Sequence, residues 1–126
     1  MRTLFLMICI LSLPVPAWAD WVKIVQHKRG NVFYIDPSSI QVVGGKRTVT
    51  ELIDYKRPDI EGDRSVRVLR EYDCEGARYQ VLSASYYKDQ MASGDVSTSA
   101  PGTMGWTDID VNTPAKAILD HVCALH

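Results

Sequence analysis

Two cysteines constrain the fold of this chain more than any other feature of its sequence. The chain contains three cysteines, and because Cys9 lies in an apolar leader, Cys74 and Cys123 remain for the body of the protein. Outside the cytosol, two such cysteines most simply form a disulfide bond. Their bond would close a loop of about 50 residues and would stabilise a fold by about 4 kcal/mol in the chain-entropy model.

The leader that contains Cys9 has the features of a secretory signal peptide. Arg2 supplies a positive start, residues 4–11 form a short apolar stretch, and an Ala-Trp-Ala sequence ends at Ala19. Small residues at those two positions are typical of a cleavage site. The apolar stretch is shorter than the roughly 20 residues of a membrane-spanning helix. We therefore expect cleavage after Ala19 and no membrane span.

Removal of a signal peptide over residues 1–19 leaves one domain over residues 20–126. These 107 residues have the length of a single domain and are enough for a modest core. Without Arg2 the chain has 13 basic and 15 acidic residues, which gives a net charge of −2. A general nucleic-acid binder would need a basic stripe and a high pI, so we expect no nucleic-acid partner.

Two other uses of the cysteines fit the sequence less well than a disulfide. A redox pair is usually Cys-x-x-Cys, and that motif is absent from the sequence. A zinc site needs three or four ligands, and the spacing of His27, His121 and His126 is not that of a metal motif. No phosphate loop, dinucleotide fingerprint or calcium loop occurs either. The sequence therefore predicts no cofactor and no metal.

Alternating apolar and polar residues predict an antiparallel sheet of five or six strands. The predicted strands cover residues 21–26, 32–35, 40–43, 47–55, 65–74 and 78–87, with a further short strand near 96–99. Asp36-Pro37-Ser38-Ser39 predicts a tight turn after the second strand, and Gly44-Gly45 predicts a hairpin. Because no helix separates these strands, a parallel sheet is not expected.

A single helix is predicted at the end of the chain. Thr113-Pro114 fits its start, and Ala115, Ile118, Leu119 and Val122 fall at i, i+3, i+4 and i+7, which is one helical face. Cys123 lies close to that face, so the disulfide would attach the helix to the end of the 65–74 strand. Trp106 and Ile109 are expected to close over the core. The predicted fold class is α+β, an antiparallel sheet with one C-terminal helix packed on a face and stapled by a disulfide.

Candidate catalytic residues occur singly and form no recognisable constellation. His27 is a lone histidine in a predicted turn, where a histidine is usually inert. Asp36, Asp54 and Asp73 lie near strand ends, and two carboxylates at about 5 to 9 Å would suit a glycosidase. Turn capping or ion pairing explains these aspartates more simply. We therefore predict that the protein is not an enzyme, and keep a small hydrolase as the third alternative.

A group of basic residues is the candidate binding surface. Its members surround one predicted loop and the strand after it: Lys56, Arg57, Arg64, Arg67 and Arg70. Arg67 and Arg70 are separated by an odd number of positions, so they are expected on opposite faces of a strand. Three acidic residues, Asp59, Glu61 and Asp63, belong to the same segment and can neutralise it. An ordinary charged surface is the alternative interpretation.

The order of several short sequence elements resembles the bacterial surface-adhesin protein E family. The elements are Tyr34-Ile35-Asp36-Pro37-Ser38-Ser39-Ile40, Leu52-Ile53-Asp54-Tyr55 with Ser65, Glu71-Tyr72-Asp73-Cys74 with Arg78, Tyr86-Tyr87 before Met91-Ala92-Ser93-Gly94, Trp106, and Val122-Cys123. The resemblance covers residues 21 to 123. Its most telling part is Asp-Cys before a basic strand, with a distant cysteine in the last helix.

The resemblance implies an antiparallel sheet whose C-terminal helix is held by Cys74–Cys123, in an envelope or surface protein of a Gram-negative bacterium. The named member of that family is anchored by lipid and binds host proteins such as vitronectin and laminin, so the resemblance implies a host matrix or envelope protein as the partner. This chain lacks a lipid-attachment cysteine, so a periplasmic or secreted location is expected beside cell-surface display.

Two functions remain in view at this point. The first is an exported, non-enzymatic protein-binding module of the adhesin type. The second is a periplasmic structural or ligand-binding protein without an adhesive role. In either case an uncovered sheet edge invites pairing with a second copy, so a homodimer is a further expectation.

Overall fold

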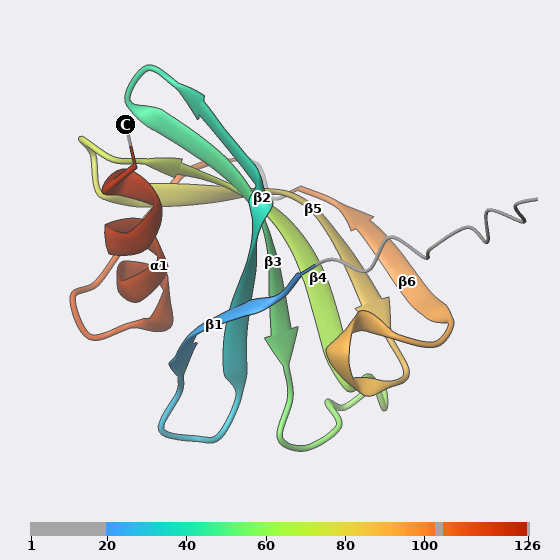
Figure 1. The fold of residues 1–126 in the computed structure, drawn as a ribbon. Helices are drawn as coiled ribbons and strands as arrows, with labels where there is room; N and C mark the ends of the chain where they lie inside the picture. Colours follow the sequence, from blue (N-terminus) through green and yellow to red (C-terminus); the bar gives the residue numbers. More distant parts are fainter. Residues whose placement is uncertain (1–19, 103–104, 126) are drawn as a thin grey trace, which may run out of the picture.

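The fold consists of one antiparallel sheet and one C-terminal helix (Figure 1). The structure is a computed structural model, and it describes residues 20–102 and 105–125. The predicted signal peptide over residues 1–19, with its cleavage site, lies outside the described residues. No helix in the described ranges is long and apolar enough to cross a membrane.

The strands follow one another in space in the order of the sequence, from β1 to β6, and every neighbouring pair is antiparallel. Their bounds are β1 Val22–Gln26, β2 Val32–Val43, β3 Lys46–Asp54, β4 Ser65–Asp73, β5 Arg78–Tyr87 and β6 Val96–Pro101. The short β7, Thr107–Asp108, pairs with the start of β5, a 3₁₀ turn η1 covers Gln90–Ala92, and α1 covers Pro114–Cys123. The predicted α+β fold, an antiparallel sheet of five or six strands with one C-terminal helix, is therefore confirmed, with six strands in the main order and the short β7 beside β5.

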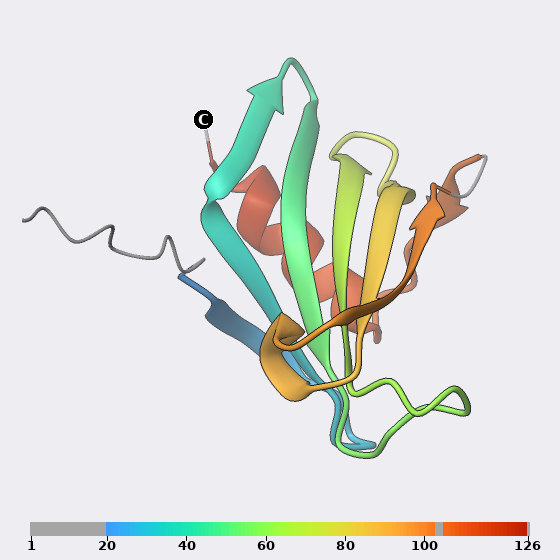
Figure 2. The ribbon, with the colours of Figure 1, turned by 90° about the vertical axis from the view of Figure 1, so that its right-hand side faces the viewer.

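Alternation along the strands gives the sheet two chemically different faces. The face that carries α1, called the helix face here, includes Ile35, Val49, Glu51, Arg70 and Tyr72. The opposite face, called the outer face, includes Thr50, Leu52, Arg67, Leu69 and Ser83. In Figure 2 α1 lies behind the sheet, while η1 and β6 pass in front of it.

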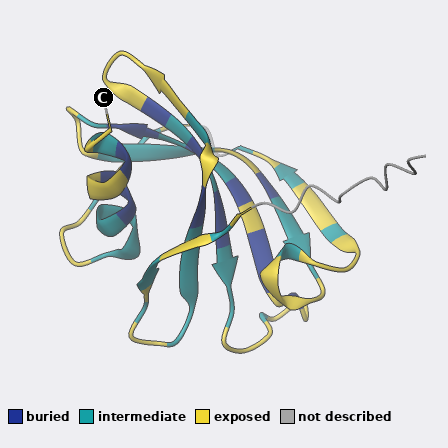
Figure 3. Cartoon of the chain, viewed as in Figure 1, coloured by how far each residue is buried: buried dark blue, intermediate teal, exposed yellow. Residues whose placement is uncertain are grey.

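The main core lies between α1 and the helix face. The buried residues of α1 are Ile118, Leu119 and Val122, three of the four that the sequence placed on one face. They pack on Ile35, Val49 and Tyr72. Figure 3 shows the buried side of α1 turned toward the sheet, whereas its outer side and the connecting loops are exposed. A second buried cluster, Val66, Val68 and Ala84, lies farther along the same face.

The start of α1 agrees with the sequence in position and differs in chemistry. Thr113 is the N-cap residue and Pro114 opens the helix, as predicted. The Thr113 hydroxyl does not cap α1, because it donates to the carbonyl oxygen of Asp110 instead. This bond stabilises the turn that leads into the helix, while the fixed φ of Pro114 favours the first helical turn.

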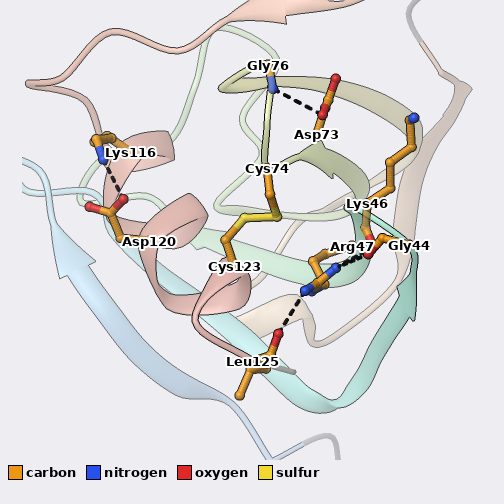
Figure 4. Close-up of a disulfide and its surroundings, with 10 residues drawn as sticks. All are labelled: Gly44, Lys46, Arg47, Asp73, Cys74, Gly76, Lys116, Asp120, Cys123 and Leu125. Atoms are coloured by element: carbon orange, nitrogen blue, oxygen red, sulfur yellow. Dashed lines mark hydrogen bonds and ion pairs between the residues drawn. A yellow bond between two sulfur atoms is a disulfide. The ribbon is translucent and has the colours of Figure 1, made fainter.

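The predicted disulfide between Cys74 and Cys123 is confirmed. The two Sγ atoms are 2.08 Å apart and the Cα atoms are 5.8 Å apart. The bond links the residue that follows β4 to the last residue of α1 (Figure 4). Beside it, Arg47 donates to the carbonyl oxygens of Gly44 and Leu125, each at 2.8 Å. The C-terminal end of α1 is therefore attached to the sheet twice, once by a covalent bond and once by a buried guanidinium.

The tight turn predicted for residues 36–39 is wrong. β2 continues through these residues, and its register with β3 shifts between Asp36 and Gln41. Asp36 Oδ1 accepts hydrogen bonds from the backbone N–H and the hydroxyl of Ser38. The Ser39 hydroxyl donates to the Asp36 carbonyl oxygen and accepts the Thr50 N–H at 2.8 Å. Side chains thus replace the missing ladder bonds, and the strand bulges instead of reversing.

Of the two residues that were predicted to close over the core before α1, Trp106 and Ile109, only Ile109 does so. Ile109 packs against the main core, which confirms that part of the prediction. Trp106 instead lies under cations, with the Arg78 guanidinium 4.7 Å and the Lys46 ammonium 6.0 Å from its ring. Cation–π attraction therefore holds this indole at the rim of the sheet. β1 and β6 end the main strand order, and pairing of such an edge with a second copy stays a prediction.

Candidate functional site

The structure divides the five predicted basic residues among three places. Lys56 and Arg57 are exposed in the loop between β3 and β4, and Arg64 is exposed where that loop ends. Arg67 is exposed on the outer face. Arg70 is only 9% exposed and lies on the helix face. The expected opposition of Arg67 and Arg70 is confirmed, so the five residues do not form one continuous surface.

Lys56 and Arg57 meet a residue that the sequence interpretation missed. Arg29 and Asn31, from the connection between β1 and β2, line a cleft of about 350 Å³ together with Lys56 and Arg57. We call this the loop-end cleft. In an antiparallel meander every second connection lies at the same end of the sheet, which is why these two loops meet (Figure 1). That rule, applied to the basic turn at Lys28-Arg29, is the signal that would have identified Arg29.

Contacts between the two loops hold the loop-end cleft in place. The Lys56 N–H donates to Asn31 Oδ1 at 3.1 Å. Gly30 has φ +103°, and a Cβ at this position would lie 2.3 Å from Lys56 Cδ. The glycine therefore permits both the left-handed backbone and the close approach of the lysine stem. The Arg29 N–H donates to His27 Nδ1 at 3.1 Å, which fixes the turn and occupies the candidate base.

The acidic residues of the β3–β4 loop do not neutralise the loop-end cleft by direct pairing. Asp59 Oδ1 accepts the backbone N–H groups of Glu61 and Asp63. Asp63 is buried and pairs with Lys88 at 3.2 Å. A hydrogen bond from Ser97 and the nearby Lys88 lower the pKa of the Asp63 carboxyl. Across residues 20–102 and 105–125 no carboxylate lies within 4 Å of a cationic nitrogen of Arg29, Lys56 or Arg57.

Arg70 belongs to a buried polar group inside the fold. Its Nη1 is 3.2 Å from Glu51 Oε1, and the Tyr72 hydroxyl donates to Glu51 Oε2 at 2.6 Å. Its guanidinium also lies 4.5 Å from the centre of the Tyr79 ring. Glu51 and Tyr72 are fully buried. The prediction of Arg70 on a binding surface is therefore at odds with its position, since its partners are core residues.

Burial dominates the electrostatics of this group. It raises the pKa of the Glu51 carboxyl, against the opposing effects of Arg70 and of the hydrogen bond from Tyr72. It also raises the pKa of the Tyr72 hydroxyl, and the neighbouring Glu51 carboxylate adds to that effect. A buried pair of this kind confers little net stability, but loss of one partner is costly because the other charge remains in the core.

The carboxylates considered for catalysis serve the local structure. Asp36 caps Ser38 within the bulge, and Asp54 Oδ1 accepts the Met91 N–H at 2.8 Å. Asp73 pairs with Arg78 at 2.9 Å, which is the first cause of the lowered pKa of its carboxyl. Among the residues that the structure describes, no three His, Cys, Asp or Glu side chains are grouped to hold a metal ion.

Comparison with known proteins gives one family match and several structural matches. The family described as Surface-adhesin protein E matches residues 21–124, which confirms the resemblance seen in the order of the sequence elements. No curated protein matches this sequence.

The structural matches are to Haemophilus influenzae protein E. Crystal form II of that protein is 17% identical, covers 88% of this chain and 92% of its own, and has a TM-score of 0.65. A selenomethionine form is 19% identical, covers 92% and 95%, and has a TM-score of 0.61. Protein E from non-typeable H. influenzae is 17% identical, covers 88% and 80%, and has a TM-score of 0.56. At these identities the likeness shows a shared fold.

Proposed function

This chain belongs to the surface-adhesin protein E family, and from that membership we propose that it is an exported, non-enzymatic module that binds a protein partner. We place it in the periplasm or at the surface of a Gram-negative cell, or in its surroundings. The disulfide Cys74–Cys123 supports this location, because such bonds persist in oxidising compartments. A signal peptide over residues 1–19 would deliver the chain there.

We assign partner binding to the loop-end cleft. The single observation that carries this assignment is the convergence of Arg29, Lys56 and Arg57 from two loops, with no carboxylate of the described chain paired to them. Unpaired surface cations attract an acidic segment of a partner and raise its rate of association. An acidic stretch of a host matrix protein or of an envelope protein is the partner chemistry that fits.

Charge reversal tests this assignment. The double variant Lys56→Glu/Arg57→Glu should bind immobilised laminin or vitronectin at least about tenfold more weakly than the parent, and parental binding should weaken as salt screens the cations. The control Lys23→Glu/Lys116→Glu reverses the same number of charges on β1 and α1, away from the cleft. Equal binding by the parent and the cleft variant, or an equal loss in the control, would contradict the assignment.

A periplasmic ligand-binding protein without an adhesive role is the second candidate function. It is favoured by a small groove on the outer face that shares no lining residue with the loop-end cleft. Digestion of intact cells with a protease discriminates the two functions. An adhesin must be accessible from outside and should be degraded, whereas a periplasmic protein should survive until the outer membrane is opened.

A further inference from the structure

The outer face contains a groove that the adhesin function does not use. Its volume is about 250 Å³, and its lining residues come from three adjacent strands: Thr50 of β3, Arg67 and Leu69 of β4, and Ser83, Ser85 and Tyr87 of β5. Cross-strand pairing places Arg67 directly opposite Ser85, and Leu69 between Thr50 and Ser83. One guanidinium is thus surrounded by hydroxyl groups and one aliphatic side chain.

Arg67 has no partner within residues 20–102 and 105–125. No described carboxylate or hydrogen-bond acceptor lies within bonding distance of its guanidinium. The acidic residues on the same face are engaged elsewhere, and Asp36 and Asp73 have the partners Ser38 and Arg78. Asp54 accepts the Met91 N–H, and Glu71 accepts a hydrogen bond from Gln80 at 2.7 Å. The groove therefore presents one uncompensated positive charge.

Fixed contacts near the groove indicate that it is formed before any ligand arrives. Ser65, the cross-strand neighbour of Tyr87, is fully buried. Its hydroxyl donates to the Asp89 carbonyl oxygen at 2.6 Å and accepts the Ala92 N–H at 2.9 Å. These two bonds and the bond from Met91 to Asp54 hold η1 against β3 and β4. A preformed site loses little conformational entropy on binding.

We propose that this groove binds a small carboxylated sugar. The planar guanidinium of Arg67 can hold a carboxylate through two parallel hydrogen bonds. The hydroxyls of Thr50 and Ser83 match the hydroxyl groups of a sugar ring, since each can donate or accept. The Ser85 hydroxyl, which lies 3.3 Å from the Ser99 hydroxyl, keeps capacity for a further bond. Tyr87 adds an aromatic side chain at one end. A single cation suits a monoanionic carboxylate better than a phosphate, and the volume suits one sugar unit.

The test titrates the oxidised, ¹⁵N-labelled exported protein with sodium glucuronate and with sodium N-acetylneuraminate. At least one probe should shift the amide resonances of Arg67, Ser83 and Ser85 saturably, with a dissociation constant on the order of 1 mM. Arg67→Gln should weaken that binding about tenfold or more, and Arg67→Lys should retain part of it because the charge remains without the planar fork. Arg64→Gln, an exposed neutralisation three residues away, should change nothing.

Four outcomes would overturn the proposal. Neither probe binds saturably up to its solubility limit, or Arg67→Gln binds as the parent does. Alternatively, glucose shifts the same amides with equal affinity, which would remove the role of the carboxylate, or sulfate does so, which would remove the role of the sugar. Circular dichroism of each variant establishes that it is folded. Because Lys56 and Arg57 lie outside this groove, their double variant should still bind the probe, which separates this proposal from the protein-binding one.

Discussion

Removal of the disulfide should destabilise the domain by about 4 kcal/mol without detaching α1. The bond joins residues 49 positions apart. For a closed loop of that length the chain-entropy expression gives about 14 cal/mol/K, which is about 4 kcal/mol at 25 °C. A domain of this size has roughly 5 to 15 kcal/mol of stability in total. The double variant Cys74→Ala/Cys123→Ala should therefore fold, with a Tm lower by about 20 °C.

The remaining contacts explain why α1 should stay attached. Ile118, Leu119 and Val122 remain buried against the sheet, and Arg47 still donates to the Leu125 carbonyl oxygen. The effect should thus arise in the unfolded chain, which becomes free to expand. Urea unfolding followed by circular dichroism should give the lower free energy of unfolding together with a larger m-value, because a more expanded chain exposes more surface.

Amide hydrogen exchange shows whether the loss of stability comes from expansion of the unfolded chain or from detachment of α1 in the folded protein. Under native conditions the amides of Ile118 to Val122 should remain protected in the cysteine-free variant. The control variant Arg47→Met removes the second attachment without altering the unfolded chain, so it should lower stability with an unchanged m-value. A loss below about 1 kcal/mol, or unprotected α1 amides in the cysteine-free variant at an unchanged m-value, would refute an effect that arises in the unfolded chain.

Two further substitutions test the interior. Arg70→Met should cost about 3 to 5 kcal/mol at pH 7, because Glu51 would keep a buried charge without its cationic partner. Burial already raises the pKa of Glu51 in the fold, so stability gained by its protonation is present below its unfolded pKa and is lost as the pH rises through the folded pKa. The loss should consequently shrink on acidification, and urea unfolding from pH 4 to pH 8 would contradict this if it gave a constant loss. Ser39→Ala should cost about 1 to 2 kcal/mol in thermal unfolding, because it removes a donor to Asp36 and an acceptor for Thr50; an equal effect of Ser38→Ala, at the exposed position beside it, would argue against a special role of Ser39.

The sequence predicted the sheet and the helix because burial imposes a period on each element. In β4 the positions of Val66, Val68 and Tyr72 alternate with exposed or half-buried ones, and all three are buried in the structure. The same period predicts that Arg67 and Arg70 lie on opposite faces of β4. The disulfide was predictable because the sequence, once the leader is set aside, offers only two cysteines.

The bulge in β2 was not predictable from local chemistry. Asp36, Pro37 and Ser39 favour a turn and a bulge equally well. In both, the Asp36 and Ser39 side chains bond to nearby backbone and the ring of Pro37 fixes φ. What selects the bulge is a partner distant in sequence. The Thr50 N–H of β3 donates to the Ser39 hydroxyl, a bond that a tight turn would not provide. β3 also pairs with β2 on both sides of the register shift. Only the folded sheet supplies that information.

The loop-end cleft was half predicted for a related reason. Lys56 and Arg57 were identified by their proximity in sequence, whereas Arg29 joins them through the topology of the meander. Arg70 was included because it is close to Arg67 in sequence. In the structure it lies on the helix face, where it pairs with Glu51, so it is not part of a binding surface.

The strand order and the alternation of side chains along each strand therefore decide together which cations can contact a ligand. On the helix face α1, held by the disulfide and by Arg47, covers the main core, and the charged groups Glu51 and Arg70 of that face pair inside the fold. Four cations without a carboxylate partner in the described ranges, Arg29, Lys56, Arg57 and Arg67, lie at the loop end and on the outer face. Because the core lies on the face where α1 is attached, substitution of the exposed cations elsewhere should leave the core undisturbed. For that reason the loop-end variant and the Arg67 variants should alter binding while leaving the free energy of unfolding within about 0.5 kcal/mol of the parent.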